Sequence, residues 1–367
     1  MALAQLGMTS RFIPSPGESV ERDPQTGELT GLLIDMDEYL RRRLPSVATA
    51  HEFQRAVRQA SDRLLSHGLT AIQDASVTND LSAYDAFREW INAGDLRVRT
   101  SLLLNAQALE EGVATGLKEG EESPSLCVHG VKIRLDEGSG ELYPPQHVLN
   151  ERVWHAHRLG FPVAIHAIEP SALVSALHAI RLAQGRLPRP KIRHRIEHCA
   201  LCPEVCIDEM AALGVGVVTQ PAFLWHHGPR YLAEIEPEQQ PWLYRVKRFL
   251  DRGVPVAGSS DAPVVPPRPL EGVCAAVTRR TCDGRTIGPD ERVSVEEALG
   301  LFTQAAAWAC GRESQLGSIT PGKLADLVIL DADPTRVPPD EVREIPVRMT
   351  IVGGVVRWSA EGERAVL

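Results

Sequence analysis

The 367-residue chain is long enough to bury a large core, and a single (β/α) barrel can reach this size. Its 43% hydrophobic and 24% charged residues are typical of globular proteins, and its net charge of -9 argues against nucleic acid or an anionic membrane as a main partner. No apolar run approaches the roughly 20 residues of a membrane-spanning helix, and the first residues lack a secretory signal pattern. Seven scattered cysteines, an odd number, predict reduced thiols and a cytoplasmic location.

Residues 1–50 contain many turn-forming prolines and glycines, and no complete strand–helix unit fits within them, which predicts an irregular segment. From residue 52 apolar side chains recur with the period of a helix, which Gly68 ends. Short apolar strands and helices then alternate. The predicted strands are 69–75, 96–104, 127–135, 162–167, 193–198, 215–220 and 255–260. The predicted helices are 52–67, 81–93, 107–117, 145–159, 171–183, 204–213, 241–252, 270–281 and 294–310.

Strands separated by helices predict an α/β fold with a parallel sheet. Seven such strands are one fewer than a closed TIM-type barrel contains, so we expect a (β/α) barrel over residues 51–318 that lacks one strand. The tail, 319–367, is predicted to form a small appended β segment, because 325–330 and 347–356 resemble strands.

Four residues suited to metal binding or proton transfer fall near the C-terminal ends of the predicted strands: Lys132, His166, His198 and Asp261. In a barrel these ends converge on one mouth, so we expect the four side chains to share one site. Imidazole and carboxylate are ligands of Zn²⁺ and similar divalent ions. Lys132 stands out because the chain has only five lysines and this one lies in an apolar strand.

Each of these residues also has a structural interpretation. The Lys132 ammonium can form a salt bridge with a nearby carboxylate, Asp136 or Glu137. Either histidine can be a packed and hydrogen-bonded core residue, and Asp261 can cap a following helix. Strict alternation along residues 193–198 predicts one face with His194, Ile196 and His198, and another with Arg193, Arg195 and Glu197.

Five segments, in the right order and spread over nearly the whole chain, resemble the amidohydrolase superfamily, and most closely its amidohydrolase-3 branch of YtcJ-like and N-substituted formamide deformylase-like proteins. They are residues 131–133 (Val-Lys-Ile), 163–167 (Val-Ala-Ile-His-Ala), 194–198 (His-Arg-Ile-Glu-His), 258–263 (Gly-Ser-Ser-Asp-Ala-Pro) and 317–330 (Gly-Ser-Ile-Thr-Pro-Gly-Lys-Leu-Ala-Asp-Leu-Val-Ile-Leu). The resemblance implies a distorted (β/α)₈ barrel with a mono- or dinuclear metal centre and a β-sandwich built from both chain termini.

The resemblance also implies roles for the four strand-end residues. Lys132 would be the lysine that binuclear members carboxylate with CO₂ into a bridging carbamate. His166 and His198 would be metal ligands on the next two strands. Asp261 would bind metal, take the proton of the attacking water and pass it to the leaving nitrogen. The expected cofactor is a divalent metal, Zn²⁺ with Mn²⁺ or Ni²⁺ as alternatives, in one or two ions.

The sequence departs from the family at its beginning. Family members carry a His-x-His motif at the end of the first barrel strand, and no such motif precedes Lys132 here. His155 and His157 have this spacing, but they lie in a predicted helix, so we reject them as a substitute. Either the first strand is missing from this chain, or the protein has diverged to an open seven-stranded barrel. Loss of two ligands would severely weaken one of the two metal sites.

Three further patterns carry weaker signals. Cys199, Cys202 and Cys206 form C-x₂-C-x₃-C, but no second cysteine cluster completes a zinc site. An insert over residues 223–231 is predicted to be an irregular loop at the barrel mouth, with substrate-binding candidates Trp225, His226 and His227. The glycine-containing stretch 137–141 is too short and too acidic to hold a phosphate.

These observations support a metal-dependent hydrolase of non-peptide C–N bonds in amides, N-substituted formamides or cyclic imides. The expected partner is a small amide-type substrate, and a homodimer is compatible with the sequence. A second hypothesis is a catalytically impaired barrel that serves as a binding or scaffold protein. A third is a truncated gene product. Metal content separates the first two hypotheses.

Overall fold

The computed structural model describes residues 2–15, 18–34, 36–44, 49–120, 123–136 and 142–362. At its centre lies a seven-stranded sheet whose strands follow chain order and are all parallel. The seven predicted strands are thereby confirmed, in an α/β fold in which β3 and β9 form the two edges of a curled sheet. The strands are β3 (Ala71–Asp74), β4 (Arg99–Leu104), β5 (Leu126–Arg134), β6 (Val163–Ala167), β7 (Arg195–His198), β8 (Gly216–Thr219) and β9 (Val256–Gly258).

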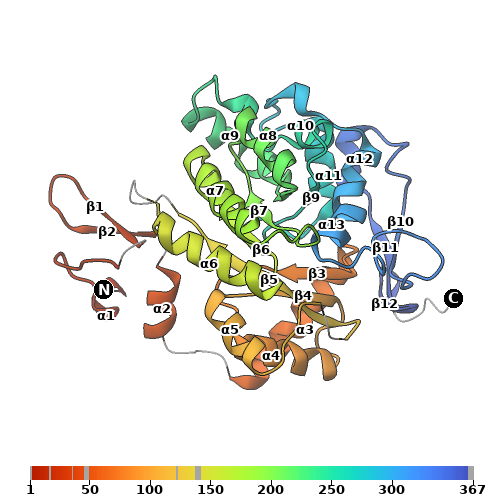
Figure 1. Ribbon diagram of the computed structural model, residues 1–367. Helices are drawn as coiled ribbons and strands as arrows, with labels where there is room; N and C mark the ends of the chain where they lie inside the picture. The colour runs from red at the N-terminus through yellow and green to blue at the C-terminus, as the bar shows by residue number, and fades with distance from the viewer. Residues whose placement is uncertain are drawn as a thin grey trace.

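Helices follow the strands along the chain and cover the outside of the sheet, as Figure 1 shows. They are α3 (Ala50–Ser66), α4 (Leu81–Asn92), α5 (Ala106–Ala114), α6 (Gln146–Leu159), α7 (Pro170–Arg186), α8 (Glu204–Leu213), α9 (Ala222–Glu234), α10 (Val246–Asp251), α11 (Pro269–Thr278), α12 (Val295–Phe302) and α13 (Gln304–Ala309). The 3₁₀ segments are η1 (Gln240–Trp242), η2 (Pro289–Glu291) and η3 (Pro339–Glu344). Most of the expected helices begin and end within a few residues of these bounds.

The two faces of the sheet have opposite chemistry. Outward-facing side chains of β5 to β9 are branched and apolar, and with the apolar faces of α6, α7 and α8 they form the main core. Register pairs Arg134 with His166 and His166 with Glu197, so these three side chains share the opposite, inner face. Lys132 and Arg195 lie two residues earlier on the same face. The alternation of side chains along each strand thus separates the apolar core from a polar, concave face.

The segment predicted to be an irregular loop over 223–231 is a helix, α9, so that prediction was wrong. Pro229 lies inside it and has no N–H to donate to the Trp225 carbonyl one turn earlier. That carbonyl accepts a hydrogen bond from the Cys282 backbone N–H instead, at 3.1 Å. A hydrogen bond from outside the helix therefore satisfies the group that the proline leaves unpaired, which sequence periodicity does not reveal.

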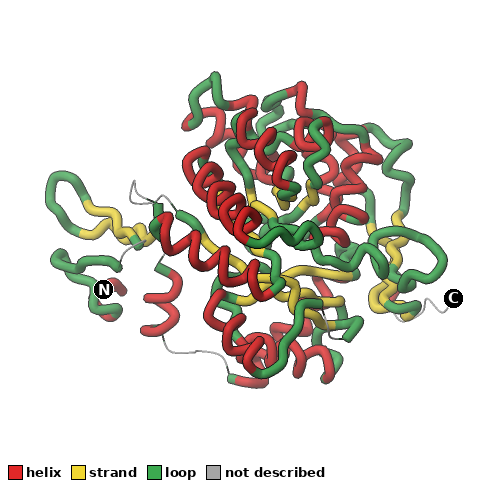
Figure 2. The backbone as a smooth tube through the Cα atoms, in the orientation of Figure 1, coloured by secondary structure: helices red, strands yellow, loops and turns green. Residues whose placement is uncertain are grey.

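Other differences are smaller. The single helix expected over 294–310 is divided at Thr303 into α12 and α13, and the helix expected over 241–252 begins only at Val246. The segment 1–50 holds short helices α1 (Ala2–Gln5) and α2 (Asp37–Arg43) and an antiparallel pair, β1 (Ser19–Arg22) with β2 (Leu29–Ile34). It is therefore more regular than predicted, and Figure 2 shows the hairpin standing apart from the main sheet.

The C-terminal tail forms the predicted small sheet, with strands β10 (Leu327–Leu330), β11 (Val347–Val352) and β12 (Val355–Ser359). It is antiparallel, and Gly353 and Gly354 make the turn between β11 and β12. The Thr350 hydroxyl donates to the Leu65 carbonyl at the end of α3. Arg99 at the start of β4 forms a two-pronged ion pair with Asp326, at 2.6 and 2.9 Å. The tail is therefore fastened to the β3–β4 side of the large sheet.

Candidate active site

Three of the four strand-end residues lie on neighbouring strands of the large sheet. Lys132 is on β5, His166 is on β6, and His198 is the last residue of β7. Asp261 follows β9 by three residues and is exposed. The charge of Asp261 acts on the pKa of Lys132 and of His198, and the charges of Lys132 and His198 act on the pKa of Asp261. The charges of Lys132 and His198 also lower the pKa of His166. The structure therefore places His198 within electrostatic range of Lys132 and Asp261, and His166 within that of Lys132, at the C-terminal mouth of the sheet.

His198 does not share a face with His194 and Ile196, so that part of the strand prediction was wrong. The backbone of His198 has φ 72°, a left-handed conformation that ends the strand and turns its side chain. Its ring lies edge-on to the His166 ring, with 4.4 Å between their centroids. His194 stays on the outer face, where its ring nitrogen lies 2.8 Å from that of His157 on α6. A change of backbone conformation at one residue thus brings the second imidazole into the site.

A glutamine that sequence reasoning missed orients His198. The Oε1 atom of Gln220, which follows β8, lies 2.8 Å from His198 Nδ1. Because the Gln220 amide nitrogen donates to the Val218 carbonyl, Oε1 is the acceptor and Nδ1 carries the proton. The other ring nitrogen, Nε2, is then free to act as an electron-pair donor. Gln220 ends a predicted strand, so the same strand-end rule that selected His198 applies to it.

Lys132 is buried in a mixed electrostatic environment. Burial lowers the pKa of its ammonium, and the positive charges of Arg195 and Arg134 act in the same direction, against Glu197 and Asp261. Asp136, an alternative salt-bridge partner for Lys132, contacts Arg134 at 2.7 Å instead. The other alternative, Glu137, lies outside the described residues. A lowered pKa increases the fraction of neutral amine, which is the form that can react as a nucleophile.

Both imidazoles of the site are uncharged at neutral pH. Burial lowers the pKa of His166 to about 2, and the nearby His198, Lys132 and Arg134 contribute. Burial also lowers the pKa of His198, although Asp261 and Glu197 act in the opposite direction. The pKa of Asp261 is raised, first because protein atoms around the mouth displace water and then through Glu197, while His198 and Lys132 oppose the rise. Neutral imidazole is the form that binds metal ions.

A buried ion pair, also missed from the sequence, lies on the concave face near Lys132. Arg195 Nε contacts Glu197 Oε1 at 2.6 Å, and both side chains are buried. The same guanidinium donates to the Gln73 side chain on β3 and to the Ala309 carbonyl at the end of α13. Arg195 therefore connects β3, β7 and α13 across the concave face, and its Glu197 partner adds a negative charge below Lys132.

The donor set fits one divalent ion better than two. Within the described ranges, no three His, Cys, Asp or Glu side chains gather closely enough to hold a metal. The two imidazoles that meet at the mouth therefore need a further donor; Asp136 Oδ1 lies 3.9 Å from His166 Nε2, and Lys132 is close enough for its charge to act on His166. The three cysteines of the C-x₂-C-x₃-C pattern are buried free thiols, and they do not lie close enough together to hold a metal ion.

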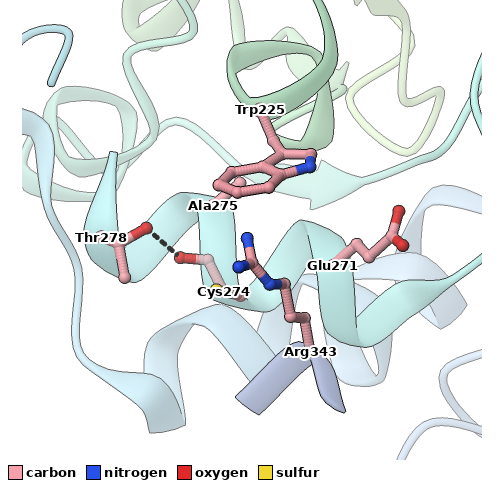
Figure 3. A pocket seen from close by; sticks show the side chains of 6 residues that line it. All are labelled: Trp225, Glu271, Cys274, Ala275, Thr278 and Arg343. Atoms are coloured by element: carbon pink, nitrogen blue, oxygen red, sulfur yellow. Dashed lines mark hydrogen bonds between the residues drawn. The ribbon is translucent and has the colours of Figure 1, made fainter. Parts of the chain in front are cut away.

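The three substrate-binding candidates lie on α9 and face different neighbours. Figure 3 shows Trp225 beside Arg343, whose guanidinium carbon lies 3.7 Å from the indole centroid, in a small cleft between α9 and α11. His226 Nε2 lies 3.1 Å from Glu271, which lines the same cleft. His227 packs edge-on against Phe223. Trp225 and His226 are thus engaged with α11 and η3, and the glycine-containing stretch 137–141 lies outside the described residues.

Comparisons with known proteins agree with this fold. The model of the amidohydrolase family matches residues 1–357. The N-substituted formamide deformylase of Arthrobacter pascens is 28% identical over 95% of this chain and 69% of its own length. YtcJ of Bacillus subtilis (strain 168) is 26% identical over 97% of this chain and 70% of its own length.

Among solved structures, an uncharacterized metal-dependent hydrolase from Pyrococcus furiosus superimposes with a TM-score of 0.72. It is 26% identical, and the match covers 91% of this chain and 69% of that one. No helix in the part of the chain that the structure describes is long and apolar enough to cross a membrane. The family match over nearly the entire length, together with the (β/α) half-barrel, shows that the chain belongs to the amidohydrolase family.

Proposed function

We propose that this protein is a metal-dependent hydrolase of a non-peptide C–N bond in a small amide, N-substituted formamide or cyclic imide. The observation that supports the proposal is the contact of the His166 and His198 rings at the C-terminal mouth of the sheet, with Lys132 and Asp261 within electrostatic range of His198. The name of the Arthrobacter pascens relative supports formamides as the first substrate class to test.

His166, His198 and Lys132 are the residues that would hold a divalent ion, with Zn²⁺ as the first candidate and Mn²⁺ or Ni²⁺ as alternatives. The lysine would contribute as a carbamate, because an ammonium has no lone pair to donate. Such an ion supplies Lewis acidity, which activates water as a nucleophile near neutral pH. The hydrogen bond from His198 to Gln220 fixes the tautomer that presents Nε2 to the mouth.

Asp261 is the proposed proton carrier. Its carboxylate is open to solvent at the mouth, and its raised pKa makes it a stronger base than an ordinary aspartate. It can accept a proton from attacking water and deliver that proton to the nitrogen of the leaving amine. Trp225, His226 and His227 remain proposed substrate contacts, with His227 the best placed because it packs against Phe223, a neighbour of Tyr244.

A second candidate function is supported by one observation. The described residues hold no complete group of three conventional ligands, as expected of a barrel that binds a small molecule without hydrolysing it. The metal content of the purified chain distinguishes the hydrolase from the binding function. The purified chain should carry close to one equivalent of metal by plasma mass spectrometry, and a metal-free chain that is folded would favour the binding function.

The activity test uses the metal-loaded chain with formanilide, acetanilide and succinimide, and a dipeptide as the negative control. We expect release of amine from at least one amide and none from the dipeptide. Asp261→Asn should abolish turnover, whereas Asp251→Asn on the exposed face of α10 should not. Equal activity of the two variants would remove Asp261 from the mechanism.

A further inference from the structure

The described residues include five non-glycine positions with a positive φ: His198, Cys199, Tyr244, Asp261 and Arg279, with φ between 47° and 72°. Side chains with a Cβ rarely adopt this backbone, and it persists where the surrounding structure holds it, often at functional sites. His198 and Asp261 belong to the candidate site, and Cys199 follows His198. The remaining two, Tyr244 and Arg279, contact each other through a hydrogen bond from the Arg279 guanidinium to the Tyr244 carbonyl.

Tyr244 is held beside the exit of β7. Its backbone N–H donates to the Ala200 carbonyl at 2.9 Å, and Leu243 forms a β-bridge with Leu201. Both partners lie within three residues of His198. The phenol is buried, and the Asp261 carboxylate is close enough to contribute to its electrostatic environment. Tyr244 is therefore anchored at the mouth of the sheet, between the strand that ends in His198 and the loop that carries Asp261.

Arg279 holds the backbone of Tyr244 in this position. Its side chain is completely buried and donates to three backbone carbonyls: Tyr244 at 2.7 Å, Leu243 at 2.7 Å and Ile287 at 2.9 Å. Because a guanidinium presents its donors in a rigid plane, it fixes two consecutive carbonyls of residues 243–244 in one orientation. The left-handed backbone of Tyr244 is thus stabilised by a dedicated buried group.

The pair of tyrosine hydroxyls has one unused donor, and it lies on Tyr244 when Tyr231 donates the shared hydrogen bond. Tyr244 and Tyr231 share one hydrogen bond, with 2.9 Å between their oxygens, and no other hydrogen bond to either hydroxyl is found among the described residues. Each phenol carries one O–H, so two protons are available for one shared bond and one of them has no protein acceptor. Burial raises the pKa of Tyr244 well above its usual value, so the hydroxyl keeps its proton.

We propose that Tyr244 is a further substrate-contacting residue of this site, in which the hydroxyl, supported by Tyr231, donates a hydrogen bond to the carbonyl oxygen of the bound amide. This inference rests on the proposed amide hydrolysis. The donor would act most strongly when negative charge develops on that oxygen as the carbon is attacked. Tyr231 on α9 and Tyr244 before α10 would thus act together on the substrate.

The test compares Tyr244→Phe with Tyr84→Phe, a control on helix α4, in the metal-loaded full chain with formanilide as substrate. Loss of one such donor is expected to lower kcat about 100-fold with a smaller change in KM. The control should keep wild-type kcat, and both variants should be folded at the assay temperature by circular dichroism. If Tyr244→Phe does not fold, Tyr231→Phe replaces it, with an expected loss in kcat of about 10-fold.

Unchanged kcat in the folded tyrosine variant overturns the inference and leaves the proposed hydrolysis standing. If the wild type hydrolyses no amide, the proposed function fails separately. The inference is then decided by calorimetric binding of formanilide to the wild type and to Tyr244→Phe. Binding about 10-fold weaker in the variant supports the hydrogen bond, and equal or undetectable binding in both overturns it.

Discussion

The buried imidazole pair on the outer face of the sheet makes a quantitative prediction about pH. His194 Nδ1 lies 3.1 Å from the Val163 backbone N–H, which can only donate, and His157 Nε2 lies 2.7 Å from the Leu187 carbonyl, which can only accept. His194 Nε2 must therefore carry the proton and donate to His157 Nδ1. A second proton on His194 would break the bond to Val163, so the native state resists protonation.

Burial, with the nearby His157, lowers the pKa of His194 from 6.5 to about 3. Between these two pH values the unfolded chain binds a proton at this residue and the native protein does not, so stability is lost as the pH falls. One pKa unit corresponds to about 1.4 kcal/mol. Lowering the pH from 7 to 5 should therefore cost about 2 kcal/mol of unfolding free energy through His194 alone.

The assay is urea unfolding of the metal-free chain at pH 7, 6 and 5, for the wild type and His194→Asn. The variant is expected to be less stable at pH 7, because it loses the contact with His157, but its stability should fall by about 2 kcal/mol less on acidification. His147→Asn, at an exposed position on α6, should keep the wild-type pH dependence. Parallel pH curves for the wild type and His194→Asn would refute the tautomer assignment and the linkage argument.

Three further predictions concern the site and its support. Lys132→Arg should lower the metal content measured by mass spectrometry, because guanidinium cannot form a carbamate, and unchanged metal would exclude Lys132 as a ligand. Asp261→Asn should unfold like the wild type while its turnover is lost, and retained turnover would assign the proton transfer elsewhere. Gly216→Ala should destabilise by about 1–3 kcal/mol in thermal unfolding, because its Cβ would come within 2.6 Å of the Trp308 ring. A wild-type melting temperature for that variant would show that the ring moves aside.

The alternation of strands and helices was predictable because each buried strand is a short apolar run, whereas apolar residues in the helices recur with the period of a helical turn. The C-terminal ends of neighbouring parallel strands lie at one edge of the sheet, and this strand-end rule placed Lys132, His166 and His198 in one neighbourhood. The turn of His198 toward His166 was not predictable, because it depends on one positive φ. Helix α9 was missed because an internal proline argues for a loop, and only the distant Cys282 N–H compensates for it.

The polar residues that complete the site are of two kinds. Gln220 follows the same strand-end rule as the histidines and was accessible to it. Glu197 and Arg195 were placed correctly on a shared face, but the contact of Arg195 with Gln73, more than one hundred residues away, is a product of the curl of the sheet. Long-range polar contacts of this type leave no periodic signal in one sequence.

The division of the sheet into an apolar outer face and a polar inner face also bears on how such a protein can change. Neighbouring residues of one strand contribute to separate properties, one alternate set to cohesion with the helices and the other to the polar concave face. Replacement of a concave-side residue that makes no contact outside the site therefore leaves the packing of strand against helix intact. New substrate preferences can accumulate there without a corresponding loss of folding free energy.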